Sequence, residues 1–322
     1  MSETLIEAKN LKKYFPVQNF FGGNKHFVKA VDDVSLTIQQ GETFGLVGES
    51  GCGKSTLGRT IIRMYDVTEG DILFHGVNIA RLKRKQLGEY HKKMQIIFQD
   101  PYSALNPSMN VGEIISEPLL LNRDLSPKDR EDKIVSLLER VGMKKDDIGK
   151  FPYEFSGGQR QRIGIARALS TDPEFILCDE PISALDVSIQ AQVINLLEDC
   201  QKRSGVSYLF VAHDLSMVRH ISQHIGVMYL GSLVECGDCS EVYDHPLHPY
   251  TQALLSAIPI PDPQKARNSS RQIIKGNLPS PMDIPSGCRF HTRCPYAKKI
   301  CCEQAPAFRQ VAEGHEVACH LF

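Results

Sequence analysis

A nine-residue loop constrains this chain more than any other feature. Residues 48–56 read GESGCGKST, which fits the pattern of Gly, four residues, Gly, Lys and Ser or Thr. The apolar run 43–47 precedes it, and residues 55–64 follow it without a proline, so strand, loop and helix are predicted in that order. The glycines let successive backbone N–H groups point at a phosphate, and the helix adds its positive end. The loop therefore predicts a nucleotide-phosphate site in an α/β domain.

Each residue type in this P-loop has a chemical reason. Lys54 brings a mobile positive charge to the β- and γ-phosphate oxygens, and the hydroxyl of Ser55 is a ligand for Mg²⁺. The loop residues predicted to contact ATP are Gly48, Glu49, Ser50, Gly51, Cys52, Gly53, Lys54, Ser55 and Thr56. ATP and Mg²⁺ are thus the expected cofactors.

Composition excludes several classes of function. The chain has 322 residues with 37 basic and 38 acidic side chains, so its net charge is 37 − 38 = −1. Such a balance argues against a nucleic-acid binder that works by neutralising phosphates. The sequence contains no run of about 18 apolar residues, so it predicts no membrane-spanning helix. The polar start, MSETLIEAKN, does not resemble a signal peptide, so we expect the chain to stay in the cytoplasm.

The rest of the pattern predicts one sheet-based domain and an appendage. Residues 5–40 are typical of antiparallel strands, and residues 92–167 are mainly helical in pattern. Apolar runs at 175–178 and 207–212 flank a helical segment, which predicts a parallel sheet with a crossover helix. Prolines cluster after Pro246, which favours a linker and an irregular extension rather than more of the sheet.

Two carboxylates follow the apolar run at 175–178. Asp179 is positioned to hold Mg²⁺ through water, and Glu180 to polarise an attacking water. An Asp-Glu pair alone is weak evidence, because such pairs usually mark a solvated strand end.

The segment FSGGQRQR at 155–162 narrows the interpretation. It resembles the signature motif of ATP-binding-cassette (ABC) ATPases, and SALD at 183–186 and AHD at 212–214 follow in the order and spacing of that family. The resemblance covers roughly residues 5–250. It implies an α/β P-loop NTPase cassette with a RecA-like parallel core, an antiparallel β subdomain and a helical subdomain at about 94–168.

The resemblance also implies roles for individual residues. Gln99 matches the glutamine that senses the γ-phosphate and Mg²⁺, and His213 matches the switch histidine; with Glu180 they form the expected catalytic set. The remaining nucleotide contacts that the family implies are Asp179, Ser156, Gly157, Gly158, Gln159 and Asp186, and the implied Mg²⁺ ligands are Ser55, Gln99 and Asp179. The signature begins with Phe155 where the family commonly has Leu, and both are apolar anchors.

An aromatic side chain near the N-terminus stacks on adenine in this family. Lys13-Tyr14-Phe15 offers two candidates, and the Lys-x-aromatic pattern favours Phe15 over Tyr14. Either ring is also a candidate core residue.

The segment HPLHPYTQALL at 245–255 resembles the continuation found in oligopeptide, dipeptide and nickel importer ATPases. We therefore expect a nucleotide-binding domain at 1–250 and an oligopeptide-transporter-type extension at 251–322. His245 and His248 have a spacing that suits a metal, but the adjacent prolines favour structural turn residues.

Five of the ten cysteines lie in the last 35 residues. Cys288, Cys294, Cys301 and Cys319 supply four soft thiolate ligands, which suit zinc or an iron–sulfur cluster, and reduced bystander thiols are the third interpretation. The family resemblance implies a 4Fe–4S cluster, with Cys302 as the surplus thiol. Arg289 and Arg293 are expected to neutralise the charge of such a cluster.

The resemblance implies an ATPase that energises the import of oligopeptides or dipeptides, with ATP sandwiched between two cassettes. The implied partners are a second homologous ATPase in a heterodimer, two transmembrane permeases and an extracytoplasmic peptide-binding protein, with no nucleic acid. The implied location is the cytoplasmic face of the cell membrane, as a peripheral protein. Alternatives are a nickel or glutathione importer ATPase and, from another class, a soluble ABC ATPase acting on nucleic acid or ribosomes. The interval of about a hundred residues from Lys54 to Ser156 and the presence of one cassette disfavour the soluble class.

Overall fold

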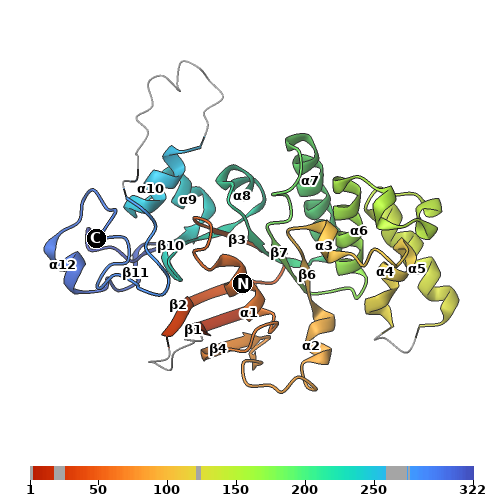
Figure 1. Ribbon diagram of the computed structural model, residues 1–322, viewed down its shortest axis with the longest axis horizontal. Coiled ribbons are helices and arrows are strands. Elements are labelled where there is room, and N and C mark those ends of the chain that lie inside the picture. Colours follow the sequence, from red (N-terminus) through yellow and green to blue (C-terminus); the bar gives the residue numbers. More distant parts are fainter. Residues whose placement is uncertain (1–2, 18–25, 121–124, 259–273, 275) are drawn as a thin grey trace, which may run out of the picture. The chain divides into compact units, whose positions relative to one another are not determined.

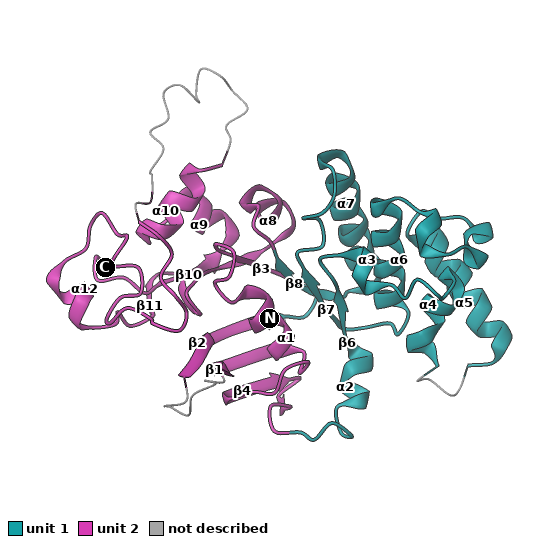
Figure 2. Cartoon of the chain, viewed as in Figure 1, with its two compact units in different colours: residues 1–3, 39–42, 82–211 teal, residues 4–38, 43–81, 212–322 magenta. Residues whose placement is uncertain are grey.

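The computed structural model describes residues 3–17, 26–120, 125–258, 274 and 276–322. The chain forms two compact units (Figure 2). Unit 1 comprises residues 1–3, 39–42 and 82–211, and unit 2 comprises residues 4–38, 43–81 and 212–322. Within the described ranges, no helix has the length and apolar character that a membrane span requires.

Unit 1 contains a parallel sheet of three strands. Strand β7 (Phe175–Asp179) pairs in parallel with β6 (Met94–Ile97) on one side and with β8 (Ser207–Val211) on the other. Every residue of β7 and β8 is buried, as expected for parallel strands whose apolar runs are continuous. Helix α7 (Val187–Ser204) connects them, which confirms the predicted strand, crossover helix and strand.

Apart from α2 (Gly88–Lys93), most of which precedes residue 92, the other helices of unit 1 lie in the region where a helical pattern was predicted. Helix α5 (Pro127–Arg140) buries Ile134, Leu137 and Leu138, which lie on one face at helical spacing. The remaining elements are α2, α3 (Pro101–Ala104), α4 (Val111–Leu119), η1 (Lys145–Gly149), η2 (Pro152–Glu154) and α6 (Gly157–Leu169). Residues 94–97, the start of the predicted helical subdomain, form β6 instead, because the short segment MQII fits a strand as well as a helix.

Unit 2 contains a four-stranded sheet in the order β2-β1-β4-β5, in which β1, β2 and β4 lie side by side (Figure 1). Its strands are β1 (Thr4–Val17), β2 (His26–Gln39), β4 (Glu69–Phe74) and β5 (Val77–Asn78). The β1–β4 and β4–β5 pairs are antiparallel. The antiparallel β subdomain is thereby confirmed.

A second sheet in unit 2 starts from the strand that carries the P-loop. Strand β3 (Thr43–Val47) is parallel to β9 (His224–Tyr229), and β9 is antiparallel to β10 (Ser232–Asp238). The helices of unit 2 are α1 (Lys54–Ile61), α8 (Leu215–Ile221), α9 (Cys239–Asp244), α10 (Pro249–Ser256) and α12 (Lys299–Glu303).

The C-terminal extension is mostly irregular, as expected, but it also extends this sheet. Strand β12 (His315–Val317) pairs with β10, and β11 (Arg309–Ala312) pairs with β12. The expectation that the tail adds nothing to the sheet is corrected here. A buried contact between Glu235 and His315, 2.8 Å apart, joins β10 to β12, so long-range pairing overrides the local proline-rich pattern.

The boundaries of the two units differ from the predicted domain boundary. The tail belongs to the same unit as the P-loop, whereas the predicted boundary lies at residue 250. The division into a cassette at 1–250 and an extension at 251–322 stays a prediction.

Candidate functional site

The P-loop has a backbone that only glycine permits at two positions. Gly48 has φ 151° and Gly53 has φ 107°. A Cβ atom at Gly48 would collide with the carbonyl oxygen of Met228, and one at Gly53 with that of Ala30. The two glycines therefore allow close approach of the loop to its neighbours as well as an unusual backbone.

Helix α1 begins directly after this loop with its N-terminus suited to an anion. Its cap is Gly53, which has no side chain to bond the first N–H groups, and the first turn carries no acidic residue. The free N–H groups and the helix dipole both favour a phosphate there. Ser55 and Thr56, in that first turn, are half-buried.

Lys54 is folded back on its own loop. Its side chain is buried, and Nζ donates to the carbonyl oxygens of Gly48 at 2.8 Å and of Glu49 at 3.0 Å. Nδ1 of His213 lies 3.4 Å from the same nitrogen. Structure thus brings together the P-loop lysine and the predicted switch histidine, which are 159 residues apart in the chain.

In unit 1 the predicted carboxylates follow strand β7. Asp179 is the last residue of the strand and is fully buried, and Glu180 comes next with φ 50°. A positive φ is uncommon for glutamate and is typical of residues held in place for function. Nε2 of Gln99 donates to Oε2 of Glu180 at 2.7 Å, so two members of the predicted catalytic set are in contact.

The signature segment caps helix α6. Ser156 is the N-cap: its Oγ accepts from the N–H of Gln159, and Oε1 of Gln159 accepts from the N–H of Ser156 at 2.9 Å. Ser156 and Gln159 are exposed, Gly157 is half-buried and Gly158 is buried, while Phe155 anchors the turn in the core. Asp186 is exposed at the start of α7. Unit 1 therefore presents Ser156, Gln159 and Asp186 at its surface.

The two adenine-stacking candidates have different surroundings. The hydroxyl of Tyr14 donates to Asp32, and burial together with this bond raises the pKa of Tyr14. Phe15 packs edge-to-face with Tyr65, with ring centroids 5.5 Å apart, and Lys13 Nζ lies 4.8 Å from its ring. Phe15 has no such polar bond, and its role as the stacking residue stays a prediction.

We expect Phe15→Ala to weaken ATP binding by about 5- to 150-fold, because stacking of a base on an aromatic ring contributes about 1–3 kcal/mol. Tyr14→Phe keeps the ring and removes only the bond to Asp32, so it should leave the dissociation constant unchanged. Fluorescent-nucleotide titration of the full chain measures both. If Tyr14→Ala weakens binding and Phe15→Ala does not, the assignment moves to Tyr14.

The four tail thiols lie near one another in unit 2. The pKa of Cys288 is raised to about 11, mainly by burial and to a smaller extent by the neighbouring thiols of Cys301, Cys319 and Cys294. Cys302 is exposed. Within the part of the chain that the structure describes, no three His, Cys, Asp or Glu side chains are arranged so that they could hold a metal ion.

Arg289 and Arg293 do not serve the thiols as expected. Arg289 bonds Asp32 at 2.6 Å and the carbonyl of Leu230, and Arg293 bonds the carboxylate of Glu49 in the P-loop. The expectation that they neutralise a thiolate cluster is wrong, because carboxylates far away in the sequence engage both guanidinium groups. Sequence inspection missed this use, since residues about 250 positions apart leave no local pattern.

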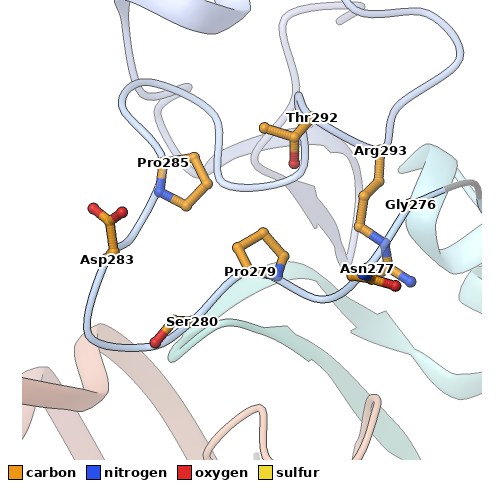
Figure 3. A pocket seen from close by; sticks show the side chains of 8 residues that line it. All are labelled: Gly276, Asn277, Pro279, Ser280, Asp283, Pro285, Thr292 and Arg293. Carbon is orange, nitrogen blue, oxygen red and sulfur yellow. The ribbon is translucent and has the colours of Figure 1, made fainter.

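Arg293 also lines a hollow of about 450 Å³ in the tail (Figure 3). The other lining residues are Gly276, Asn277, Pro279, Ser280, Asp283, Pro285 and Thr292. The hollow is open and has one acidic and one basic side chain, so its chemistry favours no particular ligand.

His248 is a structural residue, as the prolines beside it predicted. It is buried, and its Nδ1 accepts from the N–H of Tyr250 at 3.0 Å, which caps helix α10. His245 is exposed and lies 3.3 Å from Glu241. Burial lowers the pKa of His248 to about 3.

We expect His248 to make the fold acid-sensitive. The unfolded chain binds a proton at His248 below about pH 6.5, whereas the folded chain does not until about pH 3. Stability from this residue is therefore complete above pH 6.5 and falls as the pH is lowered, by about 1.4 kcal/mol per pH unit.

Urea unfolding at pH 7.5 and at pH 5.5 measures the loss of unfolding free energy on acidification. That loss should be about 1 kcal/mol smaller for His248→Asn than for the unmodified chain, because asparagine caps the helix without titrating. His245→Asn is the matched control, since that side chain is 72% exposed. Equal acid sensitivity of His248→Asn and the unmodified chain would contradict the assignment.

Comparison with known proteins agrees with this geometry. The profile of the ABC transporter family matches residues 31–183, and that of the oligopeptide/dipeptide transporter C-terminal region matches residues 234–301. The chain is 53% identical to the oligopeptide transport ATP-binding protein AppF of Bacillus subtilis, over 99% of this chain and 98% of the relative. It is 47% identical to OppF of Escherichia coli, over 98% of this chain and 96% of the relative.

Solved structures show the same fold. The dimeric ATP-binding cassette MJ0796 bound to ADP and Pi has a TM-score of 0.65 at 26% identity, over 73% of this chain and 99% of that chain. The structure of cbiO1 from Clostridium perfringens, part of the transporter complex cbiONQ, also has a TM-score of 0.65 at 26% identity, over 76% and 92%.

Proposed function

The chain belongs to the ATP-binding proteins of ABC transporters, in the group with an oligopeptide/dipeptide C-terminal region, and we propose that it hydrolyses ATP to energise peptide import. The observation that carries the proposal is nearly full-length similarity to oligopeptide transport ATP-binding proteins, tail included. The intact P-loop and the Gln99–Glu180 contact support the ATPase activity. The nickel, glutathione and soluble alternatives lack comparable support from these relatives.

The residues divide the chemistry as follows. Lys54 and the N–H groups at the start of α1 bind the phosphates, and Glu180 accepts a proton from the attacking water. Gln99 orients Glu180 through the 2.7 Å bond of its Nε2, so its amide oxygen is available as a ligand. The proposed Mg²⁺ ligands are Gln99 and Asp179 in unit 1 and Ser55 in unit 2, because their oxygens are hard ligands of the kind that Mg²⁺ prefers. Mg²⁺ would neutralise phosphate charge when it is bound.

We infer a second cassette as a partner. Ser156 and Gln159 are exposed, which supports contact of the signature with a nucleotide on another subunit. The MJ0796 cassette, of similar fold, is dimeric. A non-identical second ATPase, two permeases and an extracytoplasmic peptide-binding protein complete the proposed assembly, and the chain would lie on the cytoplasmic face of the membrane.

Co-purification tests this proposal. The tagged full chain is isolated from solubilised membranes, and mass spectrometry identifies its partners, with an untagged strain as the control. Two multi-spanning permeases with a related ATPase and a peptide-binding lipoprotein would support it. A purely soluble complex would overturn it. Uptake of labelled peptide, compared with nickel and glutathione, by vesicles holding the complex identifies the substrate.

The tail thiols support a weaker proposal of a 4Fe–4S cluster, with Zn²⁺ as the alternative. Four neighbouring thiols have suitable donor chemistry, but their arrangement in the described residues is not that of metal ligands, so we assign no step to the group. Iron together with absorbance at about 400 nm after anaerobic purification would support a cluster. Zinc without iron would support the alternative. If the protein contains neither metal, the thiols are reduced and both proposals are wrong.

A further inference from the structure

Glu49, the second residue of the P-loop, is held by the C-terminal tail. Both oxygens of its carboxylate accept from Arg293: Nη1 to Oε2 at 2.8 Å and Nη2 to Oε1 at 3.0 Å. The Arg293 side chain is only 8% exposed, and that of Glu49 is 26% exposed. A bidentate pair of this kind is stronger and more directional than a single surface ion pair.

The backbone of Glu49 is also engaged on both sides. Its N–H donates to the hydroxyl of Tyr250 at 2.8 Å, and its carbonyl accepts from Lys54 at 3.0 Å. Tyr250 belongs to α10 and Arg293 to the C-terminal tail, so both follow β9 in the chain. One loop residue is thus fixed by its carboxylate, its amide and its carbonyl.

An aromatic cluster makes these contacts rigid. The rings of Tyr229, Tyr250 and Phe290 pack with centroids 4.8 to 5.4 Å apart, and all three side chains are fully or almost fully buried. The hydroxyl of Tyr229 lies 3.3 Å from Nη1 of Arg293. The guanidinium group therefore has one preferred position, set by residues of β9, α10 and the tail.

The pair also solves an electrostatic problem. A carboxylate in a phosphate-binding loop would repel the nucleotide, since both groups are negatively charged. The positive charge of Arg293 cancels the charge of Glu49 without occupying the N–H groups at the start of α1.

We propose that Arg293 and Tyr250 are positioning residues for the nucleotide site, acting through Glu49. Arg293 neutralises the Glu49 carboxylate. Tyr250 fixes the N–H of the Gly48–Glu49 peptide, and the carbonyl of the same peptide, that of Gly48, accepts from Lys54. The inference rests on the proposed function only in requiring that the P-loop binds ATP. It makes the affinity for ATP dependent on the folded tail.

Arg293→Gln should raise the dissociation constant for ATP and the KM about tenfold, while kcat at saturating ATP changes less than about twofold, because the chemistry is untouched and only the charge of the loop changes. Arg293→Lys should keep most of the affinity. Lys299→Gln is the matched control: it removes one positive charge from the same tail at a side chain that is 90% exposed. Calorimetric titration of the full chain with Mg·ATP and steady-state assay of the assembled transporter measure these values.

A second substitution separates charge from folding. If Arg293 acts on the charge of Glu49, then Glu49→Gln in the Arg293→Gln background should restore ATP affinity to within about threefold of the unmodified chain. The inference is wrong if Arg293→Gln binds ATP like Lys299→Gln, or if Glu49→Gln restores nothing. Failure of the proposed function is distinct, because then the unmodified chain would not bind ATP.

Discussion

Lys54→Ala is expected to abolish ATP turnover. Nζ of Lys54 is held by the carbonyls of Gly48 and Glu49 beside the N-terminus of α1, where phosphates are favoured. A lysine–phosphate pair about 4 Å apart is worth on the order of 4 kcal/mol at a surface-like dielectric before desolvation, which corresponds to a rate effect of roughly a thousandfold or less. Alanine also removes the Lys54 donor from the buried carbonyl of Gly48.

Phosphate release by the assembled transporter measures this loss. Lys202→Ala is a suitable control. The substitution removes the same charge, and the Lys202 side chain on α7 is 72% exposed. Circular dichroism should show an unchanged fold for both variants. Turnover by Lys54→Ala at the rate of Lys202→Ala would contradict the assignment of the P-loop.

Glu180→Gln is expected to trap bound ATP. A general base contributes typically 10²- to 10⁴-fold to a rate, so hydrolysis should fall by about that factor. Glutamine has the same shape, and its amide oxygen can still accept from Gln99, whose Nε2 lies 2.7 Å from Oε2 of Glu180. ATP binding should therefore stay close to that of the unmodified chain.

Single-turnover hydrolysis and nucleotide retention after gel filtration distinguish the two steps. Gln99→Glu, which replaces the donor with a carboxylate beside Glu180, should disturb orientation and binding together. Loss of ATP binding in Glu180→Gln, or hydrolysis within about threefold of the unmodified rate, would show that Glu180 is not the base.

Much of the candidate site was predictable because its chemistry lies in short contiguous motifs. The P-loop, the signature and the Asp179-Glu180 pair each need particular residues next to one another, since one turn, one helix start or one strand end performs each task. The structure confirms the local elements around them: α1 after the loop, the capped start of α6, and the buried strand β7.

Predictions failed where a short segment fits a helix and a strand equally well, and where a strand pairs with a segment far away in the sequence. The segment MQII at 94–97 is too short for its pattern to distinguish a helix from a strand, and its pairing with β7 makes it a strand. Proline clustering correctly indicated an irregular tail, yet β12 pairs with β10, about 80 residues earlier, and prolines elsewhere in the tail do not prevent that.

By itself the sequence determined the fold class, the nucleotide chemistry and the family, because these depend on residue type and local spacing. Only the tertiary structure decided how the tail is used. It pairs Arg293 with Glu49 and Arg289 with Asp32, 244 and 257 residues apart. A buried guanidinium group requires a charged or hydrogen-bonding partner. The sequence offers 38 acidic residues as candidates, and only the folded chain brings a particular one within hydrogen-bonding distance.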